Sequence, residues 1–267
     1  MTSAEYAALP GITATAIKAG RKSMAHMRVA MLDDRTGEGT AAMRLGWLAH
    51  MALLEPVRFA AIVAVWNGGR RAGKAFEAWE IENAGKEQVT EGEMKTLIAM
   101  HTAGRADKDA RFAISQASEC ERVAQWTAEG IGACKARFDG WGRGVLVEYK
   151  TCRDVTPRRF LSQAESLGYT LQLAWYWHGA GRSANVWLVS QETTAPYCCV
   201  TYSVPANVLQ TAYDECVEIC LRYRACEAAN SFPGVCDTAQ TWERPAWVTS
   251  DGGETDMSNG TMEASDL

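Results

Sequence analysis

Three short segments with β-strand composition stand in the middle of the chain, and glycine-rich turns separate them. The segments cover residues 122–126, 132–138 and 145–150, and the two turns cover residues 128–130 and 140–144. Short strands joined by glycine turns pair as antiparallel neighbours. The pattern therefore predicts a three-stranded meander, and any fold of this chain has to build its sheet around it.

Helical patterns precede and follow this meander. Leucines recur at helical spacing before Pro56, and Thr90 with Glu93 forms a capping-box signature at a helix start. Pro205 opens a long amphipathic segment. The predicted helices cover residues 12–27, 40–54, 90–100, 108–117, 157–167, 168–178 and 205–229, and two further strands cover 184–192 and 197–204. Residues 57–66 are compatible with a strand or with a continuing helix, and a glycine- and arginine-rich loop follows them.

This order of elements predicts an α/β fold with a mixed central sheet, flanked by helices and joined to an N-terminal helical region. At 267 residues the chain is long enough to bury one full core. We expect a single domain over residues 1–248, with a helical part over about 12–118 and a core over about 119–248. Residues 249–267 are polar and acidic without hydrophobic periodicity, which predicts a disordered tail.

The composition is that of an ordinary globular protein, with 47% hydrophobic and 22% charged residues. No apolar run reaches the roughly 20 residues of a membrane span, and residues 1–10 lack the pattern of a secretory signal. We therefore expect a soluble protein of the cytoplasm. The nine cysteines all follow residue 119, and we predict free thiols because their number is odd and no export signal is present.

The net charge of −5 argues against a basic surface over the whole chain. Because the affinity of a protein for nucleic acid depends on phosphate neutralisation, any such contact has to be local. Arg70 with Arg71, and Arg158 with Arg159, are candidates for phosphate contacts. Solvated surface charge is an equally good interpretation of each group.

Asp139, Glu148 and Lys150 form the constellation with the clearest chemistry. Alternate residues of a strand share a face, so Glu148 and Lys150 point the same way, and the glycine turn returns Asp139 beside them. Two carboxylates suit Mg²⁺ or Mn²⁺, which prefer oxygen ligands. A neighbouring ammonium can offset the negative charge that develops when a phosphate is attacked. On these residues alone, an exposed strand with an acid and a lysine two positions apart is the alternative.

Further motifs, in matching order, give the chain a family resemblance. They are LGWLAHMALLEP at residues 45–56, KARFD at residues 135–139 and QLAWY at residues 172–176. From about residue 12 to residue 247 the chain resembles the RecB-like branch of the PD-(D/E)xK nucleases, most closely the exonuclease VIII (RecE-type) phage recombination exonucleases. This resemblance implies a restriction-endonuclease-like fold. Members often have aspartate where Glu148 stands and proline where Phe138 stands, and glutamate still ligates metal.

The resemblance also implies roles for individual side chains. The implied metal ligands are His50, Asp139 and Glu148, the implied catalytic residues are Lys150, Glu121, Gln172 and Tyr176, and Arg137 is an implied DNA contact. The implied cofactor is one or two Mg²⁺ or Mn²⁺ ions. Three alternatives stay open: His50 as a core histidine, Glu119 in place of Glu121, and Tyr176 as a packing residue.

The function that the resemblance implies is a metal-dependent exonuclease acting 5′→3′ on the ends of linear double-stranded DNA. It would generate single-stranded DNA for phage-type homologous recombination, with a single-strand annealing protein as partner and a ring-shaped homo-oligomer as assembly. A structure-specific endonuclease or nickase on the same fold is one alternative. A non-catalytic protein that binds DNA ends or a host factor is another, although such a protein is expected to have lost part of the Asp–Glu–Lys set.

Four late cysteines require a separate interpretation. Some RecB-type nucleases hold an iron–sulfur cluster with one early and three late cysteines. Here the first cysteine is only Cys120, and the spacing of Cys216, Cys220, Cys226 and Cys236 differs from that late group. Because Cys216 and Cys220 also fit the buried face of a helix, we expect free thiols and no cluster.

Overall fold

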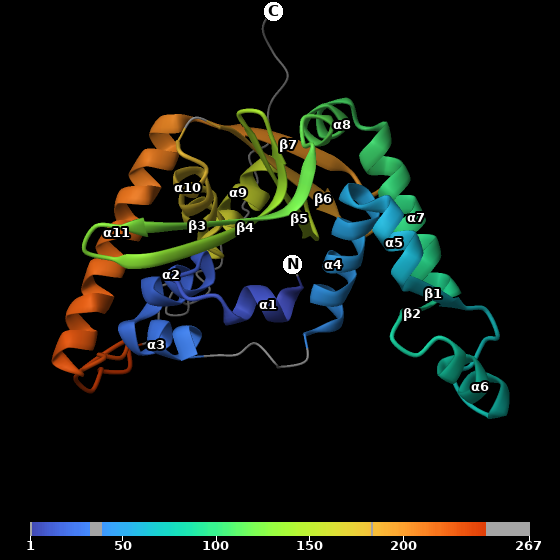
Figure 1. Ribbon diagram of the computed structural model, residues 1–267, viewed down its shortest axis with the longest axis horizontal. Helices are drawn as coiled ribbons and strands as arrows, with labels where there is room; N and C mark the ends of the chain where they lie inside the picture. The colour runs from blue at the N-terminus through green and yellow to red at the C-terminus, as the bar shows by residue number, and fades with distance from the viewer. Residues whose placement is uncertain (1, 33–38, 183, 244–267) are drawn as a thin grey trace, which may run out of the picture. The chain divides into compact units, whose positions relative to one another are not determined.

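The structure, a computed structural model, describes residues 2–32, 39–182 and 184–243. It is mixed α/β, with a five-stranded sheet flanked by helices (Figure 1), as the sequence predicted. The chain up to Val235 forms one compact unit. The tail predicted over residues 249–267 lies outside the described residues.

The sheet has the strand order β3-β4-β5-β6-β7. Its strands are β3 (Glu119–Ala128), β4 (Gly132–Gly142), β5 (Val145–Cys152), β6 (Asn185–Glu192) and β7 (Cys199–Val204). The first three pair antiparallel, which confirms the predicted meander. β5 and β6 pair parallel, and β6 and β7 pair antiparallel. A parallel pair requires a crossover connection, which is made here by α9 (Pro157–Ser166) and α10 (Tyr169–Gly179).

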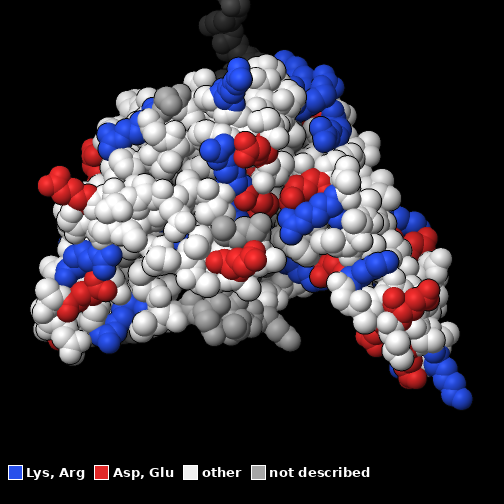
Figure 2. Space-filling view, viewed as in Figure 1, with Lys and Arg blue, Asp and Glu red and all other residues white. Residues whose placement is uncertain are grey.

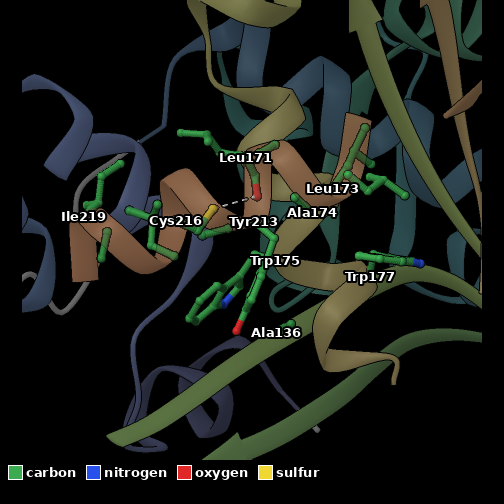
Figure 3. Packing of buried hydrophobic residues seen from close by; sticks show 14 of the residues in the cluster. Ala136, Leu171, Leu173, Ala174, Trp175, Trp177, Tyr213, Cys216 and Ile219 are labelled. Carbon is green, nitrogen blue, oxygen red and sulfur yellow. Dashed lines mark hydrogen bonds between the residues drawn. The ribbon is translucent and has the colours of Figure 1, made fainter. Parts of the chain in front are cut away.

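One hydrophobic core lies between the sheet and five helices. α9 supplies Phe160 and Ala164, and the other four helices are grouped on one side in Figure 1. These four helices are α2 (Ala14–Lys22), α3 (Met24–Leu32), α10 and α11 (Ala206–Ala229). Figure 3 shows Trp175 of α10 and Tyr213 of α11 close to Ala136 of β4. The thiol of Cys216 donates to the carbonyl oxygen of Leu171 at 3.5 Å, which ties α11 to α10. This packing fixes α10, the helix that carries the QLAWY motif.

A second core lies between the sheet and the helices of the other side. These are α4 (Ala41–Leu54), α5 (Pro56–Ile62), α7 (Glu91–Ala106) and α8 (Lys108–Ser115). The capping box of Thr90 and Glu93 is present at the start of α7, as predicted. The side chain of Thr40 caps α4 in a similar way. Within the described part of the chain, no helix has the length and apolar character needed to cross a bilayer.

The prediction of one helix over residues 12–27 was wrong. The chain is extended at Ser23, with φ −171° and ψ 161°, and this residue separates α2 from α3. The hydroxyl oxygen of Ser23 accepts the backbone N–H of His26 at 3.2 Å. Serine favours such caps over helix interiors because its side chain satisfies a free N–H at a helix start. The break therefore has a local cause, which hydrophobic periodicity does not detect.

Residues 57–66 contain both of the elements that the sequence left open, because α5 is followed directly by β1 (Val63–Trp66). β1 pairs parallel with β2 (Glu87–Thr90), and α6 (Lys74–Glu82) lies between them in the chain. Neither β2 nor α6 was predicted, and neither was α1 (Ser3–Ala8). All of these unpredicted elements are short, so periodicity gives little signal for them.

Candidate active site

The strands β4 and β5 separate at the position of the motif residues. Their ladder pairs Gly140 with Val147 and goes no further toward Asp139. Instead, the backbone N–H of Tyr149 donates to Oδ2 of Asp139 at 2.9 Å. A carboxylate thus replaces a backbone partner, and a charged side chain is fixed where the strands part.

A pocket of about 540 Å³ lies at this separation. Its walls come from α2, α4, the ends of the three meander strands and the start of α10. The polar residues that line it are Lys18, His50, Glu121, Arg137, Asp139, Tyr149, Lys150, Thr151, Tyr169 and Gln172. The chain therefore brings side chains that are more than 150 positions apart to one site.

His50 lies between two carboxylates in this pocket. Its Nε2 atom is 3.5 Å from Oδ1 of Asp139 and 3.7 Å from Oε1 of Glu121. One ligand atom from each of these three residues lies within 4.8 Å of the others, a spacing that could hold a metal ion. His50 is buried, but it faces acidic groups rather than the hydrocarbon core that the alternative interpretation required.

Gly46 allows α4 to approach the sheet closely enough to bring His50 there. A Cβ atom at Gly46 would come 2.8 Å from Oγ1 of Thr151, at the end of β5. His50 follows Gly46 by four residues, which places both on one face of the helix. The glycine and histidine of the LGWLAH motif are thus linked by geometry, because the first lets the second reach the pocket.

Glu121 reaches the pocket through an unusual backbone conformation. Its φ is +56°, in the left-handed region, and the ladder between β3 and β4 omits Glu121 and Asp139. Such an interruption re-aims a side chain at a cost in backbone energy. Glu119, the alternative candidate, is exposed and pairs with Arg122 instead. Of the two glutamates, Glu121 is therefore the one that the fold directs into the site.

This conformation gives a testable stability difference between two variants of Glu121. We expect Glu121→Gly to be more stable than Glu121→Ala by about 1 kcal/mol, because a left-handed residue with a Cβ costs roughly 1–2 kcal/mol. In an ordinary strand the order is reversed, since glycine is less stable than alanine there by roughly 0.5–1 kcal/mol. Urea unfolding of both variants measures the order. Alanine as the more stable variant would contradict a left-handed Glu121.

Glu148 and Lys150 share one face of β5, as strand alternation predicted. The ammonium of Lys150 donates to Oε1 of Glu148, and the side-chain amide of Gln172 donates to the same oxygen. The Gln172 amide also lies 3.3 Å from the hydroxyl of Tyr176. The ring of Tyr176 packs edge-on against Phe138, with 5.4 Å between the ring centroids. The ring of Tyr176 thus packs and its hydroxyl joins the polar network, while its catalytic role stays a prediction.

Burial and neighbouring charges shift the pKa values of these groups. Burial, reinforced by the charge of Asp139, raises the pKa of Glu148 well above that of an ordinary glutamate. Burial also acts on Asp139, but His50 and Lys150 outweigh it and lower the pKa of this carboxyl. In His50 and Lys150 burial opposes the charged form, and the surrounding carboxylates outweigh it and raise both pKa values. The buried carboxylates thus stabilise the positive charges of His50 and Lys150, and these in turn stabilise the negative charge of Asp139.

Two buried polar atoms of the site have no hydrogen-bond partner among the described residues. They are Nε2 of His50 and Oε2 of Glu148. Because buried polar atoms are nearly always paired, each unpaired atom requires an explanation. Carboxylate oxygens and an imidazole nitrogen are suitable ligands for Mn²⁺, and carboxylate oxygens for Mg²⁺. The group with the spacing for a divalent cation is therefore His50, Glu121 and Asp139, rather than the predicted set of His50, Asp139 and Glu148. Glu148 interacts electrostatically with Asp139 and His50, and its ligation of the cation stays a prediction.

The raised pKa of Glu148 predicts pH-dependent metal binding. A cation has to displace the proton that this carboxyl retains, so Mn²⁺ affinity should fall as the pH drops through a range well above the ordinary glutamate pKa of ~4.3. The raised pKa of His50 acts in the same direction. Calorimetric titration at several pH values, in buffers with different ionisation enthalpies, should detect proton release. An affinity that is constant from pH 5 to pH 8, with no proton release, would contradict this.

The predicted arginines divide between the pocket and other surfaces. Arg137 lines the pocket and pairs with Glu121 at 2.8 Å. Arg71 lies in the loop before α6 and donates to the carbonyl oxygen of Gln88 at 3.0 Å; Arg70 precedes it. Arg158 and Arg159 line a separate surface hollow on α9. On the face in Figure 2, basic and acidic side chains are interspersed among the described residues, so phosphate contacts there would be local.

Among the polar residues that line the pocket, sequence reasoning missed Lys18, Tyr149, Thr151 and Tyr169. Lys18 enters from α2, and Tyr169 stands at the first position of α10. The ammonium groups of Lys18 and Lys150 lie 5.9 and 5.4 Å from the centroid of the Tyr169 ring. No motif marks Lys18, because its position depends on how the N-terminal helix packs against α10. In the sequence, Tyr169 is marked only by its position between Gly168 and the QLAWY motif, which does not indicate a role in the site.

Taken together, the mixed sheet and the Asp139, Glu148 and Lys150 set at a split strand pair define a PD-(D/E)xK-type domain. The chain belongs to the family described as PDDEXK-like domain of unknown function (DUF3799), which matches residues 13–245. No curated protein matches the sequence.

A solved structure with the same fold is the crystal structure of a protein from Eubacterium rectale, described as a "putative exonuclease". The two structures superpose with a TM-score of 0.61 at 13% sequence identity, over 94% of this chain and 98% of the other. At this level of identity the likeness concerns the fold.

Proposed function

We propose that this protein is a divalent-metal-dependent nuclease that degrades linear double-stranded DNA from its ends. The observation that carries the proposal is that His50, Glu121 and Asp139 line one pocket together with Lys150, whose ammonium donates to the buried Glu148. Two roles are separated there, because the acidic groups can bind a cation and the ammonium can meet a phosphate. A protein that only bound DNA would not require both.

The residues of the chain have distinct tasks in this proposal. His50, Glu121 and Asp139 would hold the ion, Glu148 would add a carboxylate beside them, and the N–H of Tyr149 orients Asp139. When bound, Mg²⁺ or Mn²⁺ supplies positive charge to the scissile phosphate and makes an attacking water more acidic. Lys150 is fixed beside Glu148 and offsets the negative charge that builds up on the phosphate. Gln172 holds Glu148 in place, and Tyr176 adjoins Gln172.

The more specific part of the proposal is 5′→3′ exonuclease action that leaves a single strand for recombination. Its support is the sequence resemblance to RecE-type exonucleases, together with the description given to the similar Eubacterium rectale structure. The same resemblance proposes a ring-shaped homo-oligomer and a single-strand annealing protein as partner, in the cytoplasm of the host cell. DNA contacts by Arg137, Arg70, Arg71, Arg158 and Arg159 belong to this proposal.

Three DNA substrates distinguish exonuclease action from its alternatives. The purified protein is incubated with Mg²⁺ or Mn²⁺ and a linear duplex labelled at the 5′ ends, one labelled at the 3′ ends, or a covalently closed circle. We expect early release of the 5′ label and an intact circle. A nicked or linearised circle would indicate an endonuclease. Binding of linear DNA without cleavage in either metal would indicate a non-catalytic protein.

A further inference from the structure

Lys18 is a charged side chain of the N-terminal helical region that ends inside the pocket. Its ammonium donates to Oε1 of Gln172 at 2.9 Å, although 154 positions separate the two residues in the chain. Gln172 in turn donates to Oε1 of Glu148 through its Nε2 atom. A chain of hydrogen bonds therefore connects α2, through one buried amide, to a carboxylate of the proposed metal site.

The path of Lys18 to this amide is shaped by the residues at the start of α10. Gly168 has a φ of +67°, and a Cβ atom there would come 2.8 Å from Cγ of Lys18 and 3.1 Å from its Cδ. The aliphatic stem thus crosses a position where only glycine leaves room. Beyond it, the ammonium lies 5.9 Å from the centre of the Tyr169 ring, a distance at which the ring attracts a cation. These contacts restrict where the ammonium can be.

The chemistry of the two neighbours determines how the Gln172 amide is oriented. A lysine ammonium has only donors, and Oε1 of Glu148 acts as an acceptor because the Lys150 ammonium also donates to it. The end of the amide that faces Lys18 has to be the oxygen, and the end that faces Glu148 has to be the nitrogen. Since Oε1 of Glu148 accepts from Gln172 and Lys150, its other oxygen, Oε2, is the one without a hydrogen-bond partner.

We propose that Lys18 is a positioning residue that holds the Gln172 amide in the orientation that donates to Glu148. It acts through Gln172 and does not itself contact the reacting phosphate. In this way the N-terminal helical region contributes to the geometry of a carboxylate that stands on β5. The inference rests on the proposed nuclease function for its catalytic consequence, but the contact between Lys18 and the Gln172 amide can be tested without any substrate.

A double-mutant cycle measures whether Lys18 acts through Gln172. We expect Lys18→Met to lower the turnover of linear duplex by roughly 10- to 100-fold, the usual cost of losing a partner that orients a metal ligand. Lys18→Arg should restore most of the rate, because the guanidinium also donates. In a Gln172→Leu background, Lys18→Met should cause no further loss. Lys22→Met, an exposed lysine on the same helix, is the matched control.

Additive losses in this cycle would overturn the proposal, because they would mean that Lys18 contacts DNA or phosphate directly. If the wild-type protein cleaves DNA and the Lys18→Met variant cleaves it at the same rate, the proposal is overturned as well. A loss of folding in Lys18→Met would be visible in its melting temperature. In that case the DNA cleavage rates of Lys18→Arg and Lys18→Gln are compared. Arginine keeps a charged hydrogen-bond donor, and glutamine keeps a neutral one.

The side-chain amide signal of Gln172 gives the readout that does not depend on activity. In a ¹⁵N-labelled protein this signal is assigned by its loss in Gln172→Leu. We expect it to shift in Lys18→Met and to stay in place in Lys22→Met. An unchanged signal in Lys18→Met would overturn the proposal. If the wild-type protein cleaves no DNA and the signal nevertheless shifts, the proposed function fails while the contact between Lys18 and the Gln172 amide stands.

Discussion

Replacing Asp139 by asparagine is expected to remove Mn²⁺ binding and DNA cleavage together. The variant keeps an oxygen that can accept the N–H of Tyr149, so the local backbone should be preserved. It loses the charge that lies 3.5 Å from His50. Since losing only an outer partner of a metal ligand costs about 10- to 100-fold in affinity, losing the ligand itself should cost on the order of 100-fold or more. Calorimetric titration with Mn²⁺ measures this directly.

Glu119→Gln is the matched control for Asp139→Asn. Glu119 also lies in the meander, but it is exposed and pairs with Arg122 outside the pocket. The control variant should bind Mn²⁺ and cleave DNA like the wild-type protein. Equal Mn²⁺ affinities for wild type and Asp139→Asn would show that this carboxylate is not a ligand. Melting temperatures of both variants separate a loss of binding from a loss of folding.

Replacing Lys150 by methionine should separate turnover from metal binding. The ammonium of Lys150 is not a ligand, and its removal takes a positive charge away from the site. Mn²⁺ affinity should therefore be kept or increased. Turnover should fall by roughly 10²–10³-fold, the usual cost of losing one group that stabilises charge in a transition state. The comparison uses calorimetry and single-turnover cleavage on the same preparation.

Lys95→Met is the matched control, because it removes a lysine that lies outside the pocket. Lys95 is exposed on α7 and pairs with Glu91 at 2.8 Å. A loss of Mn²⁺ binding in Lys150→Met as large as that in Asp139→Asn would mean that the lysine organises the ligands rather than the phosphate. Normal turnover in Lys150→Met would remove the residue from the catalytic set.

The meander could be predicted from the sequence because its signals are local. Glycine turns and short strand-like segments specified β3, β4 and β5, and alternation along β5 placed Glu148 beside Lys150. Strong caps likewise specified the start of α7. The break at Ser23 escaped prediction because one side chain decides it against the periodicity on either side.

Only those site residues that belong to sequence motifs could be predicted. His50, Asp139 and Gln172 belong to recognisable motifs, and the fold brings them to one pocket. The choice of Glu121 over Glu119 depends on a left-handed backbone at one strand residue, which no sequence pattern reveals. Lys18 depends on the packing of two helices that are distant in the chain. Both features arise from tertiary structure, and this is why residue-level reasoning left the first open and missed the second.

Cleavage of linear duplex DNA by the wild-type protein, compared with Asp139→Asn, tests the central claim most directly. The reaction is run with Mg²⁺, with Mn²⁺ and with a chelator, and the release of acid-soluble nucleotides is followed over time. We expect release by the wild-type protein with either metal, none in the chelator, and none by the variant under any condition. Equal release in the chelator, or no release with either metal on any form of DNA, would contradict a metal-dependent nuclease centred on Asp139, Glu148 and Lys150.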